Sequence, residues 1–381
     1  MNKKILYNIT EDWFFCSHFL SRALAAKEMG YSIYVCAKDN KHKSIIKSHG
    51  IRFFEIPYNR KSINPIYEIY TLIRLIFIYK SIKPDIVHQI AAKPIIYGSI
   101  AAKICNLRSV INAPVGMGYV FTSNNIKAKI LRPILNFLMK NLLNSHHGKN
   151  RKNRVIFENN DDLNYFFNLG ALNKKESLVI RGAGVKLKEI NLKKRKTKSV
   201  TVALIARMIE DKGIFEFVSA VEKIKNKKIK ARFLLVGDID PLNPSSLKKE
   251  TLTKWNQEGN IEWLGWVDNV DQILIETDIL CLPSYREGLP KSLLEGASFG
   301  LPLVTTDTVG CRDVVTDGVN GFLVPVRDID KLEKAIYKLI NNEDLRIRMG
   351  NESLKIIKEK FSEEIINAQT IDIYKELVVV K

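Results

Sequence analysis

Short apolar runs alternate along the chain with longer segments that repeat apolar residues every three or four positions. The runs have the length of buried strands, and the longer segments have the period of helices packed on a sheet. In the first half the runs predict strands at residues 4–9, 32–37, 52–56, 85–88, 109–113, 155–158 and 178–181. Helical periodicity is clearest at residues 17–29, 65–80, 94–105 and 127–143. This alternation is typical of a parallel sheet with helices on both faces.

The same alternation restarts near residue 200. Strands are predicted at residues 200–206, 232–237, 261–264, 279–283, 302–305 and 322–324. Helices between them are predicted at residues 213–224, 247–258, 292–299 and 330–340. We therefore expect an α/β protein with two Rossmann-like domains, residues 1–185 and 200–361, joined by a basic linker at residues 186–199. An amphipathic helix within residues 362–381 is expected to cross back to the first domain. Since open parallel sheets bind ligands at the carboxyl ends of their strands, two such domains facing each other would enclose a cleft.

The basic charge of the chain lies in one half. Residues 1–190 hold 30 Lys and Arg against 12 Asp and Glu, whereas the rest holds 30 against 29, so nearly all of the net charge of +19 belongs to the first half. Between Ala101 and Phe157 there are ten basic residues and no acidic one. This segment favours an anionic partner. We see no aromatic interleaving or motif typical of nucleic-acid binding, so we expect no nucleic-acid partner.

Apolar residues accompany the basic ones between Ile126 and Leu143, which gives a wide apolar stripe with positive flanks. Such a helix suits an anionic membrane surface, and it equally suits a helix packed on its own sheet with a solvated basic edge. The basic residues concerned are Lys127, Lys129, Arg132 and Lys140. No apolar run reaches the ~18 residues that span a bilayer. The first residues contain no export signal, and the five scattered cysteines indicate buried thiols in a reducing compartment.

Two cations follow the first predicted strand of the second domain. Arg207 and Lys212 lie at the end of a predicted strand and the start of a predicted helix. A diphosphate bound there could interact with both the side-chain charges and the free amides of the helix N-terminus. There they would stabilise a leaving nucleoside diphosphate. Two exposed surface cations are the simpler interpretation of this pattern alone.

The segment from Pro283 to Ala297 places one glutamate, Glu287, in a Gly-Pro loop and a second, Glu295, on the following helix. Here the sequence resembles the retaining GT-B glycosyltransferases, whose signature is two glutamates separated by seven residues. Gly300-Leu301-Pro302 and the run Asp317–Val324 resemble the same group. The resemblance implies a GT-B fold and transfer of a sugar from a nucleotide donor with retention of configuration.

By that resemblance Glu287 contacts donor-sugar hydroxyls, Glu295 binds the ribose, and the backbone amides of Gly288 and Leu289 approach the phosphate. A carboxylate can accept two hydrogen bonds from a vicinal diol, and glycine lets backbone approach phosphate closely.

Two further segments resemble donor-site strands of the same group. They contribute Gly237 and Asp238 after one strand and Val267 beside the nucleotide base. Asp238 and Asp240 imitate the Asp-x-Asp metal motif of another glycosyltransferase fold, but their place in a GT-B-like sheet argues against a metal. We therefore expect no metal and no other cofactor.

The first domain is less informative. Relatives often have a catalytic His or Glu in the loop that here holds Gly116 and Gly118, so His88, at the end of the preceding predicted strand, becomes the nearest candidate base. A structural histidine is an equal alternative. An aromatic loop after the first strand is expected to face the acceptor, through Phe14, Phe15 and His18.

Further short segments, among them Phe14-Phe15 and Val115–Tyr119, resemble bacterial enzymes that extend undecaprenyl-diphosphate-linked sugars. The expectation is therefore a cytoplasmic enzyme, peripheral on the inner face of the membrane, that moves a sugar, often an N-acetylhexosamine, from a UDP-sugar to a lipid-linked saccharide. A nonhydrolysing UDP-sugar epimerase and an inactive nucleotide-sugar-binding subunit are the alternatives. The epimerases lack the pair of spaced glutamates.

Overall fold

The computed structural model describes residues 2–60, 62, 64–115, 126–143, 151–188 and 199–378. The chain forms two compact units, each with its own parallel sheet. Unit 1 comprises residues 1–184 and 363–381, and unit 2 comprises residues 185–362. The boundary thus lies at Gly184, because Val185 already pairs with Ser362 inside unit 2. Most of the predicted linker, residues 189–198, lies outside the described residues.

Unit 1 has a seven-stranded sheet in the order β3-β2-β1-β4-β5-β6-β7, with all pairs parallel. The strands are β1 (Lys4–Glu11), β2 (Ser32–Lys38), β3 (Arg52–Glu55), β4 (Ile86–Ile90), β5 (Ser109–Ala113), β6 (Lys152–Phe157) and β7 (Ser177–Val179). The helices are α1 (Asp12–His18), α2 (Leu20–Glu28), α3 (Lys43–Ser48), α4 (Pro65–Ile82), α5 (Ala92–Ile104), α7 (Ile126–Leu142), α8 (Asn160–Asn168) and α16 (Glu363–Val378).

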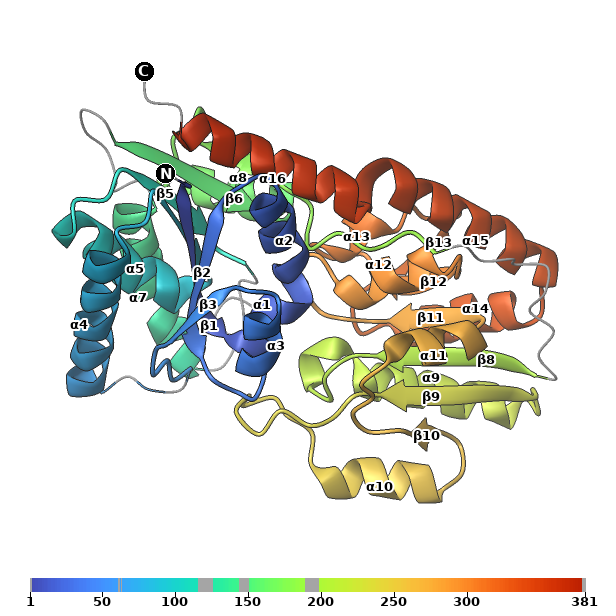
Figure 1. Cartoon of the computed structure of the whole chain (residues 1–381). Helices are drawn as coiled ribbons and strands as arrows, with labels where there is room; N and C mark the ends of the chain where they lie inside the picture. Colours follow the sequence, from blue (N-terminus) through green and yellow to red (C-terminus); the bar gives the residue numbers. More distant parts are fainter. Residues whose placement is uncertain are drawn as a thin grey trace. The chain divides into compact units, whose positions relative to one another are not determined.

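Helices cover both faces of this sheet. Figure 1 shows α4, α5 and α7 on one side of it and α1, α2 and α3 on the other. The central strands are buried along their whole length, and their apolar side chains feed a core on each face. Helix α16 packs against α2 and adds Ile366, Ile373 and Leu377 to the core of unit 1.

Unit 2 repeats the plan with six parallel strands in the order β10-β9-β8-β11-β12-β13. The strands are β8 (Val200–Ile205), β9 (Ala231–Val236), β10 (Glu262–Trp263), β11 (Ile279–Leu282), β12 (Leu303–Thr306) and β13 (Gly321–Val324). The helices are η2 (Glu210–Lys212), α9 (Ile214–Asn226), α10 (Lys249–Gln257), α11 (Val270–Glu276), α12 (Lys291–Ser298), α13 (Cys311–Val314), α14 (Ile329–Ile340), α15 (Glu343–Ile356) and η3 (Ile357–Phe361).

Both sheets change direction once. The chain moves outward from β1 to β3, then returns to place β4 beside β1, and β8 and β11 have the same relation in unit 2. At such a switch point the loops after the two central strands diverge and leave room for a ligand. Two switch points, one per unit, therefore define where bound molecules are expected.

Candidate functional site

The switch point of unit 2 brings together the loops that follow β8 and β11. The Tyr285 amide donates to the Asp211 carbonyl at 2.8 Å, which joins the two loops directly. Gly213 permits this approach, because it has φ +70° and a Cβ at that position would lie 2.1 Å from the Pro283 carbonyl oxygen. The motif segments of both loops are thus held against each other.

Lys212 and Glu287 form the centre of this site. Lys212 Nζ lies 2.5 Å from Glu287 Oε1, and Ser284 Oγ donates to the same oxygen at 2.6 Å. The side chains of Lys212 and Glu287 are 17% and 11% exposed, so the pair is shielded but still reachable. A cation and a carboxylate held in this way can bind the phosphate and the hydroxyl groups of one ligand.

The Glu287 loop is fixed from the neighbouring strand β12. Thr306 donates to the Ser284 carbonyl, Thr308 donates to the Tyr285 carbonyl at 2.9 Å, and the Glu287 amide donates to the Val309 carbonyl at 3.1 Å. Neither threonine is among the site residues predicted from the sequence. Their position at the carboxyl end of the strand beside the motif is the signal that could have identified them.

Arg207, the other predicted cation, is 41% exposed and is paired with a buried acid. Its Nη1 lies 2.6 Å from Asp240 Oδ2, while Asp240 Oδ1 accepts the Leu242 amide. Asp238 is exposed and accepts its neighbour's amide. Asp240 is therefore a positioning partner of Arg207. Among the described residues, no three His, Cys, Asp or Glu side chains are grouped as metal ligands would be.

Gly237 and Val267 lie on adjoining loops. The Gly237 amide donates to the Gly265 carbonyl at 2.8 Å, and Trp263 Nε1 donates to the Gly237 carbonyl at 2.9 Å. Val267 is half-buried and packs against the apolar core of unit 2. The loops after β9 and β10 are thereby tied together at the carboxyl edge of the sheet.

Glu295 lies on α12 with 28% of its side chain exposed, and Lys291 Nζ approaches it at 3.3 Å. Burial raises the pKa of Glu295, although Lys291 opposes that shift. Gly288, which precedes this helix, is half-buried, and Leu289 packs its side chain into the core. A carboxylate has two oxygens that can each accept more than one hydrogen bond, so the ion pair with Lys291 leaves Glu295 able to accept hydrogen bonds from ligand hydroxyls.

His88 is a core residue rather than an exposed base. Strand β4 extends to Ile90, so His88 lies in its middle, without exposed surface. Its ring stacks on Tyr7, and Nδ1 lies 2.9 Å from the Tyr374 hydroxyl. Burial, aided by the charge of Arg22, lowers the pKa of His88 to about 3. The interpretation as a general base is therefore corrected to that of a structural histidine.

The expected aromatic loop after β1 is a helix, α1. Phe15 is fully buried and meets Tyr7 edge to face, so it belongs to the core and cannot contact an acceptor. Phe14 and His18 are half-buried and lie against each other with ring centroids 4.2 Å apart. Only these two of the three predicted side chains keep accessible surface.

The predicted membrane helix is observed as α7. Its inner side contributes Met139 to the core, while Lys129 and Lys140 are exposed and Arg132 is half-buried. Exposed apolar side chains also lie along it: Ile130, Leu131, Ile134 and Phe137. Gly116, Gly118 and the side chain of Lys127 lie outside the described residues. In the described part of the chain, no helix is long and apolar enough to cross a membrane.

Two family models match the chain, one on each unit. The model described as "Glycosyl transferases group 1" matches residues 186–355. The model described as "Glycosyl transferase 4-like" matches residues 4–145.

Two curated relatives match over most of their length. One is the N,N'-diacetylbacillosaminyl-diphospho-undecaprenol alpha-1,3-N-acetylgalactosaminyltransferase of Campylobacter jejuni, 25% identical over 93% of each chain. The other is the UDP-Gal:alpha-D-GlcNAc-diphosphoundecaprenol alpha-1,3-galactosyltransferase of Escherichia coli, 25% identical over 86% of this chain and 84% of the relative.

Solved structures agree on the fold. The Anabaena protein HepE in complex with UDP and glucose has a TM-score of 0.75 at 16% identity and covers 98% of this chain and 100% of its own. Sucrose-phosphate synthase from Thermosynechococcus elongatus has a TM-score of 0.81 at 16% identity and covers 99% of each chain. The protein therefore belongs to the group 1 and 4-like glycosyltransferases, and its two Rossmann-like units have the GT-B fold.

Proposed function

We propose that the protein transfers a sugar, an N-acetylhexosamine in the first instance, from a UDP-sugar to a saccharide carried on a membrane lipid diphosphate, with retention of anomeric configuration. The observation that carries the proposal is the pairing of Lys212 with Glu287 at the switch point of unit 2. The names of the two full-length relatives, both of which act on undecaprenyl-diphosphate-linked sugars, support the acceptor class.

The charges of the site suit departure of a nucleoside diphosphate. When the bond between the anomeric carbon and the diphosphate oxygen breaks, negative charge develops on the phosphate, and Lys212 and Arg207 stabilise it. Glu287 accepts hydrogen bonds from sugar hydroxyls, and Glu295 accepts them from the ribose. Because these two cations carry the charge, transfer needs no divalent metal and no cofactor.

Transfer also requires a group that accepts the proton of the acceptor hydroxyl. The acceptor hydroxyl oxygen forms the new bond to the anomeric carbon, and its proton must be released. His88 is closed off in the core, so it is not available to receive this proton. The departing diphosphate oxygen gains negative charge at the reacting atoms and accepts the proton there.

We also propose that transfer takes place at the cytoplasmic face of a membrane, and the exposed face of α7 supports contact with a membrane surface. Ile130, Ile134 and Phe137 recur at helical spacing on its exposed side, with Lys129 and Lys140 also exposed. Basic residues near an anionic bilayer contribute about 1 kcal/mol each. The variant Lys129→Gln, Arg132→Gln, Lys140→Gln is expected to leave anionic liposomes at lower salt than the wild type does, while hydrolysis of the free donor is unchanged.

A donor screen tests the function directly. Radiolabelled UDP-sugars are incubated with the protein and membranes that contain lipid-linked saccharides, and label is counted in the organic-extractable fraction. The proposal predicts time-dependent transfer from one UDP-sugar, also in the presence of EDTA. Conversion of the donor to its epimer without any acceptor, and no label in lipid, would instead support a UDP-sugar epimerase.

A further inference from the structure

Helix α4 of unit 1 carries a second exposed apolar face that the proposed function does not use. Five large side chains along it are between 46% and 80% exposed: Ile66, Ile69, Tyr70, Ile73 and Phe77. Their spacing of three, one, three and four residues places them on one side of a helix. An apolar stripe of this kind on one helix marks an interaction surface.

The opposite side of α4 is firmly packed, so the exposed stripe does not result from a loosely placed helix. Leu75 and Tyr79 have no exposed surface and join the core beneath α4 and α5. At the start, Asn64 Oδ1 accepts the Ile66 amide at 3.0 Å and Pro65 occupies the first turn. Both features favour helix initiation at this point. The helix is apolar on its inner and its outer side.

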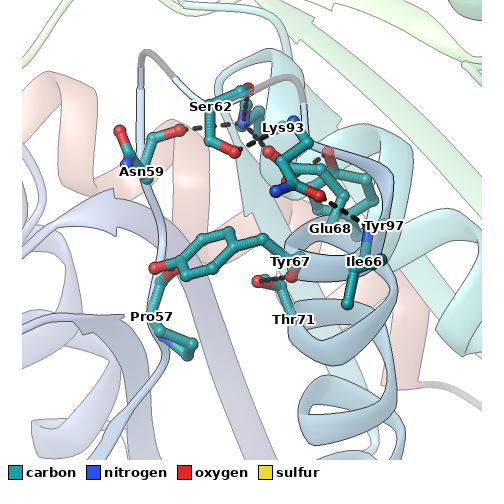
Figure 2. Close-up of polar contacts among 10 residues, drawn as sticks. Pro57, Asn59, Ser62, Ile66, Tyr67, Glu68, Thr71, Lys93 and Tyr97 are labelled. Atoms are coloured by element: carbon teal, nitrogen blue, oxygen red, sulfur yellow. Dashed lines mark hydrogen bonds and ion pairs between the residues drawn. The ribbon is translucent and has the colours of Figure 1, made fainter.

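The segment that carries the stripe is rich in basic residues, one of which, Arg60, is paired with Glu11 at 2.9 Å. Residues 57–83 hold five basic residues and one acidic residue, Glu68. Figure 2 shows that the Glu68 carboxylate is turned toward α5, where Lys93 Nζ donates at 2.6 Å and the Tyr97 hydroxyl donates at 2.6 Å. Burial alone would raise the pKa of Glu68, but these hydrogen bonds hold it below its usual range. The only negative charge of this segment is thus neutralised by an internal cation.

We propose that α4 is a membrane-binding element that lies in the interface of an anionic bilayer and inserts these five side chains among the acyl chains. A helix with apolar residues on one side and basic residues around them is suited to this position. A second copy of the chain fits less well, because a symmetric contact through α4 would bring two positively charged segments together. This inference rests on the proposed function in one respect, the membrane-lipid acceptor that gives the protein a reason to bind a bilayer.

Helix α7 lies on the same side of the unit 1 sheet as α4, with α5 in contact with both (Figure 1). Both exposed stripes therefore point away from the same face of the sheet. The two helices act through different forces. Lys129 and Lys140 of α7 contribute electrostatic attraction, which salt screens, whereas α4 contributes apolar burial, which salt does not weaken.

Co-sedimentation with vesicles separates these contributions. The triple variant Ile69→Ser, Ile73→Ser, Phe77→Ser removes three of the exposed apolar side chains. Each lost side chain is expected to weaken binding to phosphatidylglycerol vesicles roughly threefold to tenfold, at low and at high salt. The matched control Ile45→Ser, Ile275→Ser removes exposed apolar side chains from α3 and α11 and should bind as the wild type does. Circular dichroism confirms that each variant is folded.

A second measurement reports insertion without weakening the stripe. Tyr70→Trp places an indole on α4, and brominated phosphatidylglycerol should quench it strongly, whereas Ile45→Trp on α3 should gain little quenching over the wild type. Equal quenching at both positions, or wild-type binding by the triple variant, overturns the proposal.

Two further readouts separate the alternatives. Conversion of a dimer to a monomer by the triple variant, with vesicle binding intact, assigns α4 to a contact between copies and also overturns the proposal. Vesicle binding is measured without donor or acceptor. A failure of the variant to bind vesicles therefore does not affect the transferase assay, which is run separately in detergent.

Discussion

Replacement of Lys212 by alanine tests the centre of the site, because this side chain has two separable tasks. In the free protein it neutralises Glu287 at 2.5 Å, and during transfer it faces the charge that develops on the diphosphate. Loss of one preorganised charge partner at a developing anion costs about 3–4 kcal/mol, which lowers kcat/KM by a factor of roughly 10² to 10³. The matched control is Lys254→Ala, which removes an exposed helical ion pair with Glu258 and should change neither activity nor stability measurably.

Stability reports the other task. Without Lys212, the Ser284 hydroxyl is the one side-chain partner that the Glu287 carboxylate keeps among the described residues, and an under-satisfied part-buried group costs about 1–3 kcal/mol. The double variant Lys212→Met, Glu287→Gln removes both charges, so its Tm should return toward that of the wild type while transfer stays lost. Kinetics with the purified acceptor and thermal melts measure the two effects. Near-normal kcat/KM in Lys212→Ala would refute the assignment of this site.

Three other outcomes are expected. His88→Asn should retain transfer, and acidification below pH 6.5 should lower its Tm less than it lowers the Tm of the wild type. In the wild type the buried imidazole, with its pKa lowered to about 3, stays neutral in the folded state, whereas His88 of the unfolded chain takes up a proton. This difference lowers the free energy of unfolding of the wild type by about 1.4 kcal/mol per pH unit. Glu295→Gln should raise KM for the donor yet raise the Tm at neutral pH, since burial raises the pKa of this carboxyl and its ionisation therefore destabilises the folded state above the usual glutamate range; an unchanged KM would exclude the ribose contact. EDTA should leave transfer intact, and complete loss restored by manganese would return Asp238 and Asp240 to consideration as metal ligands.

The apolar pattern predicted the strands well, because strands buried on both faces are short, continuous apolar runs that few other structures produce. Short helices are harder to predict. Residues 43–48 and 270–276 are too brief to show helical periodicity, and the sequence of residues 12–18 predicts a loop, whereas the structure has a helix there with Phe15 buried. Their positions depend on tertiary contacts, which override weak local preference.

For the candidate site, too, some features could be predicted from the sequence and others could not. Residues within one contiguous motif, such as Glu287 and Glu295, could be predicted from spacing and resemblance. Contacts between distant segments could not, because they depend on which strands are neighbours. The contact of Asp240 with Arg207 can be predicted only when β8 and β9 are known to be neighbours. In the same way, the support of the Glu287 loop by Thr306 requires that β11 and β12 are neighbours. His88 shows the reverse error, since a histidine in a strand looks the same in sequence whether it faces a core or a ligand.

The structure of the product formed from a UDP-linked α-N-acetylhexosamine and a lipid-diphosphate-linked saccharide tests the proposed transfer itself. NMR of the released oligosaccharide gives the anomeric configuration of the new linkage. We expect the wild type to form an α-linked sugar on the lipid-borne acceptor and Lys212→Ala to form none. A β-linkage, or α-linked product formed equally well by that variant, would contradict this expectation.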